Sequence, residues 1–275
     1  MKLLWILAQK EIRDGLRNRW IAAAIILLGS LAFALSILGS APTGSVRASD
    51  IDITVVSLSS LSVYLIPLIA LMLSFDALVG EFERGTMMLL LTYPVTRGQV
   101  IMGKFIGHVL ILFMAIFAGY GGAIIIMTLL TDGSTEGWQA YAIMMMSSLL
   151  LGAVFIALGY LMSILVRERA TAVGAAIGLW LVFVVLYDLL LFSVLLIDDG
   201  QLMSQQLFSL LMLISPTDSY RILNLSLFEG VSEAAGIAGI ASEAGMSSAL
   251  LIGVMVSWVI VPLTATLLMF QRREL

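Results

Sequence analysis

The sequence predicts an all-α polytopic membrane protein with six transmembrane helices. Its composition is the first reason: of 275 residues, 61% are hydrophobic and 12% are charged, and the mean hydropathy is +1.09. Soluble domains carry about 25% charged residues. A fold with so little polar surface could not cover itself in water, so we expect one transmembrane domain over residues 1–275.

The second reason is the spacing of the apolar runs. Each is close to the ~20 residues that a helix needs to cross a bilayer. The runs lie at 20–40, 57–79, 104–131, 141–166, 172–197 and 248–270. An even number of spans places both ends of the chain on the same side of the membrane.

The third reason is where the positive charges fall. All but two of the 14 basic residues lie before the first run, in the loops 80–104 and 167–171, or at the C-terminus. The exceptions are Arg47 and Arg221. Basic loops stay in the cytoplasm, so we expect both termini and these two loops to be cytoplasmic.

Residues 1–19 predict a basic amphipathic helix. Trp5, Ile12 and Leu16 recur near helical spacing, with Arg13 and Arg17 turned away from them. Such a helix lies on the inner membrane surface; the alternative is a simple anchor for the first span. A cleaved signal peptide is disfavoured, because this region is long, carries acidic residues and precedes a run of full spanning length.

The segment 80–104 is the most informative part of the chain, because it concentrates charge and helix punctuation between two apolar runs. Glu81 and Glu83 suit the positive end of a helix dipole. Residues 87–91 predict a short apolar helix, which Thr92-Tyr93-Pro94 ends. A cytoplasmic helix of this kind exposes apolar side chains to water unless a groove on another protein takes them.

Segment 198–247 is the long external connection. Its apolar stretch 207–214 is too short to span, so it predicts a re-entrant or interfacial helix. Residues 229–248 are rich in Gly, Ala and Ser, which is typical of a loop.

Two carboxylates lie within predicted spans. Ionisable groups in a membrane are candidates for function. Asp76 is near a cytoplasmic end, where contact with water or with Arg84 is the simpler explanation. Asp188 lies deeper, and both a polar cavity and interhelical bonding remain open for it.

Metal and nucleotide chemistry are weakly supported. The absence of cysteine excludes disulfides and thiolate metal sites, and His108 is the only histidine. Met144, Met145 and Met146 would point in different directions on a helix, so they favour packing over a copper site. The segment 98–105 approaches a phosphate-binding loop but has Phe105 in place of the hydroxyl residue and no strand before it. Small-residue packing by Gly103 with Gly107, and by Gly174 with Gly178, is the better interpretation.

The residues of segment 80–104 resemble those of the ABC-2 class of ATP-binding-cassette permeases. The class joins its second and third spans by a G-E-x-E-x-G-T segment, a run of Leu and a Pro-x-x-Arg turn. The matching residues are Gly80, Glu81, Glu83, Gly85, Thr86, Leu89, Leu90, Pro94, Arg97 and Lys104. The similarity extends over the whole chain, including Ser215-Pro216 in the last external segment. Within the class it is similar to the membrane subunits that help to mature nitrous oxide reductase.

The resemblance implies a homodimer in the bacterial inner membrane, a separate cytoplasmic ATPase that holds ATP and Mg, and a periplasmic partner on segment 198–247. The chain itself would be no enzyme, bind no cofactor or metal, and contact lipid but not nucleic acid. The implied ATPase-coupling residues are Glu81, Glu83, Arg84, Gly85, Thr86, Leu89, Leu90, Pro94 and Arg97, with a second contact at Arg167, Glu168 and Arg169.

ATP-driven motion would then serve assembly of the copper–sulfur centres of the reductase. An ABC-2 exporter of a lipid, drug, peptide or copper species is the main alternative. An intramembrane enzyme is disfavoured because His108 has no evident nucleophile beside it. A scaffold that transports nothing is a further alternative.

Overall fold

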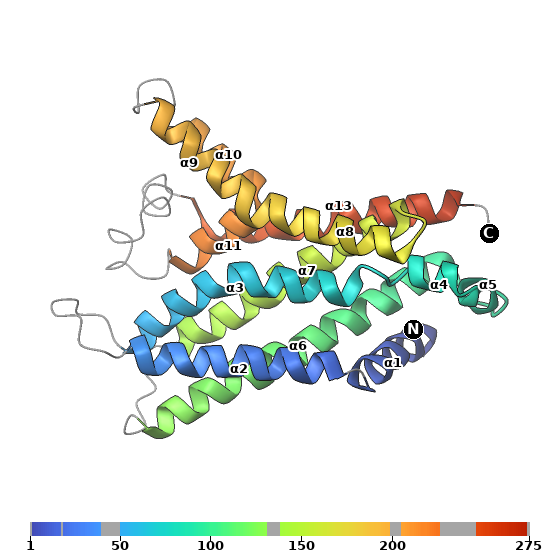
Figure 1. Ribbon diagram of the computed structural model, residues 1–275, viewed down its shortest axis with the longest axis horizontal. Helices are drawn as coiled ribbons and strands as arrows, with labels where there is room; N and C mark the ends of the chain where they lie inside the picture. Colours follow the sequence, from blue (N-terminus) through green and yellow to red (C-terminus); the bar gives the residue numbers. More distant parts are fainter. Residues whose placement is uncertain are drawn as a thin grey trace.

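A computed structural model describes residues 2–17, 19–39, 50–130, 138–198, 205–225 and 246–273. Every regular element in these ranges is helical, and none of them contains a strand, so the all-α prediction is confirmed. The helices form an elongated bundle, with the N-terminus and α13's C-terminal end near α4 and α5 at one end of it (Figure 1).

The helices follow one another along the chain as labelled in Figure 1. Their bounds are α1 Lys2–Arg17, α2 Arg19–Gly39, α3 Asp50–Ser74, α4 Val79–Glu83, α5 Thr86–Leu91, α6 Arg97–Leu130 and α7 Trp138–Leu165. After these come α8 Arg169–Leu181, the π-helix η1 Val182–Leu186, α9 Tyr187–Asp198, α10 Gln205–Ile214, α11 Pro216–Leu225 and α13 Ser248–Arg272.

The spanning helices agree with the predicted apolar runs. Among the described residues, five helical segments are long and apolar enough to cross a membrane, and there are six if the bent pair formed by α1 and α2 is one span. The chain is therefore a multi-pass membrane protein, and the sixth span depends on α2, which covers the first predicted run.

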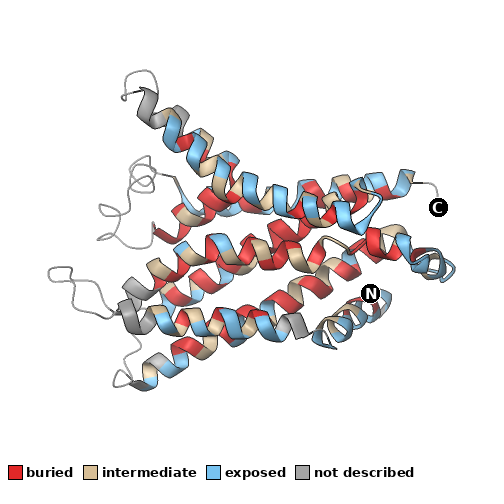
Figure 2. Ribbon diagram, viewed as in Figure 1, coloured by how far each residue is buried: buried red, intermediate tan, exposed pale blue. Residues whose placement is uncertain are grey.

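The central helix is α7, which packs against α3, α6 and α13. Its most apolar window is 72% buried, whereas the window of the continuous segment Arg169–Val194 is 17% buried. Figure 2 shows this contrast, with α7 largely red and α8 and α9 largely pale blue. Gly159 lets α7 approach α3 closely, because a Cβ there would lie 2.0 Å from Ser74 Oγ.

The described part of segment 198–247 is more structured than the sequence indicated. The predicted short helix at 207–214 is present as α10, and a second helix, α11, follows with Pro216 in its first turn, where proline is favoured. Nine of the ten residues of α11 are buried. The loop expected at 229–248 falls mostly outside the described residues.

Candidate functional site

The helices α4 and α5 lie at the end of the bundle where α6 begins (Figure 1). Gly85 joins them with a φ of 68°, a left-handed conformation that glycine adopts readily and that is strained for residues with a side chain. The predicted short helix at 87–91 is confirmed, with a start at Thr86 and an end at Leu91.

The outer surface of α5 is apolar and exposed. Met88 is 57% exposed, Leu89 66% and Tyr93 67%, whereas Met87 is fully buried against the bundle. We call Met88, Leu89 and Tyr93 the α5 tip. The described part of the chain leaves the α5 tip uncovered.

The base of α4 is fixed by a buried cluster around Lys104. The Lys104 ammonium, 3% exposed, lies 2.7 Å from Glu11 Oε1 and 2.8 Å from Glu81 Oε1. Lys10 adds a longer contact of 3.4 Å to Glu81. Burial acts to raise the pKa of Glu11, but Lys104 and its other cationic neighbours outweigh burial and hold that pKa below its usual value. Glu11 therefore stays charged, and Lys104 joins α1, α4 and α6.

The cluster continues into the bundle through His108. Its Nδ1 lies 2.9 Å from the Tyr160 hydroxyl, and its Nε2 lies 3.6 Å from Glu11 Oε2. His108 is thus a buried hydrogen-bonding residue between α6 and α7, as the sequence favoured. Among the described residues, no three His, Cys, Asp or Glu side chains gather where they could hold a metal ion.

Two glycines let α1 approach α6 closely. A Cβ at Gly103 would lie 2.7 Å from Leu7 Cβ, and one at Gly107 would lie 2.7 Å from Glu11 Cβ. This is small-residue packing, as predicted for this pair, and α1 is the partner helix. The segment 98–105 lies within α6, so it is not a phosphate-binding loop.

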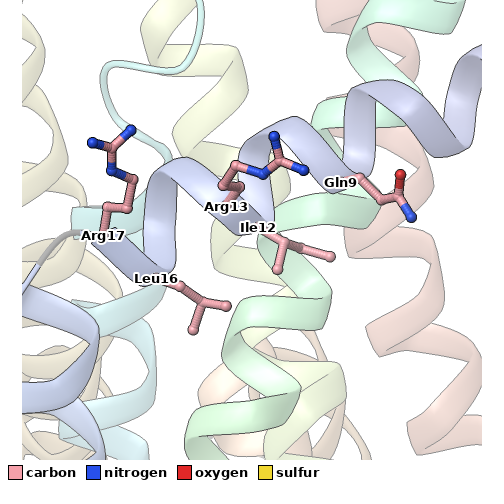
Figure 3. A pocket seen from close by; sticks show the side chains of 5 residues that line it. All are labelled: Gln9, Ile12, Arg13, Leu16 and Arg17. Carbon is pink, nitrogen blue, oxygen red and sulfur yellow. The ribbon is translucent and has the colours of Figure 1, made fainter.

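The rest of α1 faces away from α6. Figure 3 shows Arg13 and Arg17 on one side of the helix and Ile12 and Leu16 on the other, around a shallow hollow of about 430 Å³. Trp5 is also 53% exposed. The predicted amphipathic helix is present, and within the described residues Trp5 and Leu16 of its apolar stripe are exposed whereas Ile12 is half-buried.

Arg97, which opens α6, holds the start of that helix to α13. Its Nη1 donates to the carbonyl oxygens of Phe270, of Gln271 at 2.8 Å and of Arg273 at 3.0 Å. Arg273 in turn stacks over the Phe82 ring of α4 at 4.3 Å. Arg97 thus caps the C-terminus of α13, where cations are favourable.

The start of α8 is held by α4 and by the turn between α3 and α4. Arg169 forms an ion pair with Asp76, and its backbone N–H donates to Glu83 Oε1 at 2.7 Å. The expected alternative of an Asp76–Arg84 pair is wrong, because Asp76 pairs with Arg169. The partner of Asp76 is 93 residues away in sequence, so spacing alone could not identify it.

The predicted coupling residues divide into two groups. Glu81 is buried, and Leu90 and Arg97 are half-buried, so these three act inside the chain. The remainder are exposed: Glu83, Arg84, Gly85, Thr86, Leu89, Pro94, Arg167, Glu168 and Arg169. Of these, Glu83 and Arg169 also bond to each other, and Arg169 pairs with Asp76. Sequence reasoning missed Glu11 and the Thr96–Gln99 capping box, in which each residue bonds the other's backbone N–H. The T-x-x-Q spacing could have revealed the box.

Comparison with known proteins adds to this geometry. The ABC-2 family transporter proteins match residues 5–275. The chain belongs to the ABC-2 family. Two relatives are each described as a "Probable ABC transporter permease protein NosY". The one from Stutzerimonas stutzeri is 42% identical over 275 residues, and the alignment covers 99% of both chains. The one from Pseudomonas aeruginosa is 42% identical over 277 aligned positions, and the alignment covers both chains in full. The expected ABC-2 membership and similarity to NosY are confirmed.

Proposed function

We propose that this chain is the membrane subunit of a NosY-type complex in which a separate, NosF-like ATPase binds the α5 tip. The observation that carries the proposal is the exposure of Met88 and Leu89 on α5 and of Tyr93 just after it. The preceding helix, α4, is fixed to the bundle by buried charge pairs. A rigid base transmits displacement, because packed cores do not deform continuously. ATP and Mg belong to the partner subunit.

Three connections would carry the displacement into the bundle. Glu81 leads through Lys104 to α1 and α6, Arg97 leads to α13, and Glu83 leads to α8. The exposed Arg167 and Glu168 beside α8 would give the ATPase a second contact. Both termini and these loops would face the cytoplasm of a bacterial inner membrane, as the basic residues indicate.

A second copy of the chain would cover α8 and α9. Within the described part of the chain, no atom of another helix lies within 4 Å of a Cβ built at Gly174 or Gly178, in contrast to Gly103 and Gly107. An open small-residue face on the least buried span suits close helix packing between two copies.

At the periplasmic face, opposite the ATPase, the movement would serve assembly of the copper–sulfur centres of nitrous oxide reductase. A NosD-like periplasmic protein would dock there on segment 198–247. Similarity to two NosY relatives over the full length favours this role over export of another cargo.

Complementation tests this assignment. In a denitrifying strain that lacks its own NosY, expression of this chain should restore copper-loaded, active nitrous oxide reductase. The control is a strain that carries the empty vector. Normal expression of the chain without recovery of the copper centres would contradict the maturation role, and resistance to a drug or metal in the same cells would favour an exporter.

A further inference from the structure

Two carboxylates and one guanidinium meet at the end of the bundle away from α4 and α5 (Figure 1). Arg221 Nη2 donates to Asp188 Oδ2 at 2.8 Å, and Arg221 Nη1 donates to Asp218 Oδ1 at 3.0 Å. Asp188 belongs to α9, whereas Asp218 and Arg221 belong to α11. Asp188 is therefore an interhelical bonding group, one of the two roles left open by the sequence.

This triad lacks one positive charge. Asp218 is 1% exposed, and the side chains of Arg221 and Asp188 are 21% and 26% exposed. Arg221 is the only cation paired with either carboxylate among the described residues. Two anions and one cation leave an excess negative charge, which is costly to hold away from water.

The unsatisfied oxygens indicate where that charge is compensated. Asp188 Oδ1 and Asp218 Oδ2 are both buried without a hydrogen-bond partner, and the other oxygen of each carboxyl group accepts from the same guanidinium, which holds the two groups beside each other. An acid that shares its proton with a neighbouring carboxylate satisfies both oxygens at once and neutralises the triad.

The other groups around the pair do not replace that proton. On α11, Asp218 accepts from Arg221, and the Asp218 backbone N–H donates to Ser215 Oγ at 3.3 Å. On α9, the Tyr187 hydroxyl donates to the Leu211 carbonyl of α10 at 2.6 Å, so it is committed elsewhere. Tyr64 of α3 is near Arg221 and brings no positive charge.

We propose that Asp188 and Asp218 form a proton-binding site, in which one shared proton and Arg221 together hold α11 against α9. Without the proton, two carboxylates compete for one guanidinium and repel each other. The site depends on this local geometry alone and not on the proposed ATPase coupling.

The position of α11 gives the proton a structural consequence. This helix packs against α3, α7 and α13, and Thr217 Oγ1 donates to the Phe183 carbonyl in the π-helix η1 at 3.1 Å. Such π-bulges are frequent at functional sites. Loss of the proton would loosen α11 and expose its polar side chains at this end of the bundle.

The pH dependence follows from the charge balance. Burial raises the pKa of Asp218 to about 7, although Arg221 opposes this shift. An unfolded aspartate titrates near pH 3.9, so the folded protein holds the proton more tightly. The stabilising contribution is thus complete below about pH 3.9 and is lost as the pH rises through neutrality.

The test compares thermal unfolding of the purified chain with that of Asp218→Asn between about pH 5 and pH 9. We expect the midpoint of the parent to fall by on the order of 5 °C across neutrality, and that of Asp218→Asn to change much less. Asp14→Asn, an exposed carboxylate on α1, is the matched control and should follow the parent. Equal slopes for the parent and Asp218→Asn would overturn the proposal.

Two further measurements test whether the group bound between the carboxylates is a proton. Dicyclohexylcarbodiimide, which reacts with protonated carboxyl groups in apolar surroundings, should label Asp218 of the parent at low pH but not at high pH. Labelling of Asp218 that is independent of pH would contradict the site, and this readout needs no folded variant. A midpoint that responds to sodium chloride but not to choline chloride, and not to pH, would overturn the proton site in favour of a bound cation.

Discussion

Replacing Lys104 by Met should lower the free energy of unfolding by about 3–5 kcal/mol, the range for removing one partner of a buried ion pair. Methionine is close to lysine in length and fills the same space, so the loss is one of charge. Glu11 and Glu81 would then lose their buried cation and keep only the longer contacts of the half-exposed Lys10, at 3.9 Å and 3.4 Å. Unfolding of the purified chain in detergent, induced by denaturant or by heat and monitored by tryptophan fluorescence, measures the change.

Two control variants separate charge from packing. Lys10→Met removes a lysine whose side chain is 50% exposed, and exposed pairs contribute only about 0–1 kcal/mol. Adding Glu11→Gln and Glu81→Gln to Lys104→Met removes the stranded charges and should recover most of the stability. Lys104→Met that unfolds like the parent would show that the cluster does not hold α1 and α4 in place.

The second large effect concerns Leu89 of the α5 tip. Leu89→Asp should abolish capture of the ATPase subunit, because it places a charge in the centre of the proposed apolar contact. Central interface residues commonly contribute 2 kcal/mol or more, which corresponds to a rise in Kd of roughly 30-fold. Copurification of the coexpressed ATPase with the tagged chain measures the loss.

Leu129→Asp is the matched control for this experiment. Leu129 is an exposed leucine at the opposite end of α6, 79% exposed compared with 66% for Leu89. Both variants should insert in the membrane normally, because neither side chain is packed in the bundle. Full retention of the ATPase by Leu89→Asp would remove the α5 tip from the contact.

The parts of the fold that the sequence predicted are local in origin. The positions of the helices follow from residues that are close together in the chain: the apolar runs, the prolines and glycines that end helices, and the short apolar stretch at 87–91. These helices appear where they were expected. Gly103 and Gly107 were also recognisable, because a spacing of four places both on one helical face.

The contacts that organise the site depend on residues far apart in the chain. Glu11 and Lys104 are separated by 93 residues, and Arg97 and Gln271 by 174. No periodicity predicts which helices will adjoin. The family resemblance implied that Glu81 and Arg97 contact a partner, and the structure shows that both also have interactions within the chain that the sequence did not indicate.

The central claim is that the α5 tip is covered by an ATPase subunit, and site-specific cross-linking tests it most directly. The chain has no cysteine, so Leu89→Cys and Leu129→Cys each provide a single attachment point for a photoactivated maleimide reagent. In membranes that contain the ATPase and the periplasmic partner, Leu89→Cys should cross-link to the ATPase and Leu129→Cys should not. Equal labelling of Leu89→Cys by maleimide with and without the ATPase, together with no cross-linked product, would contradict the claim.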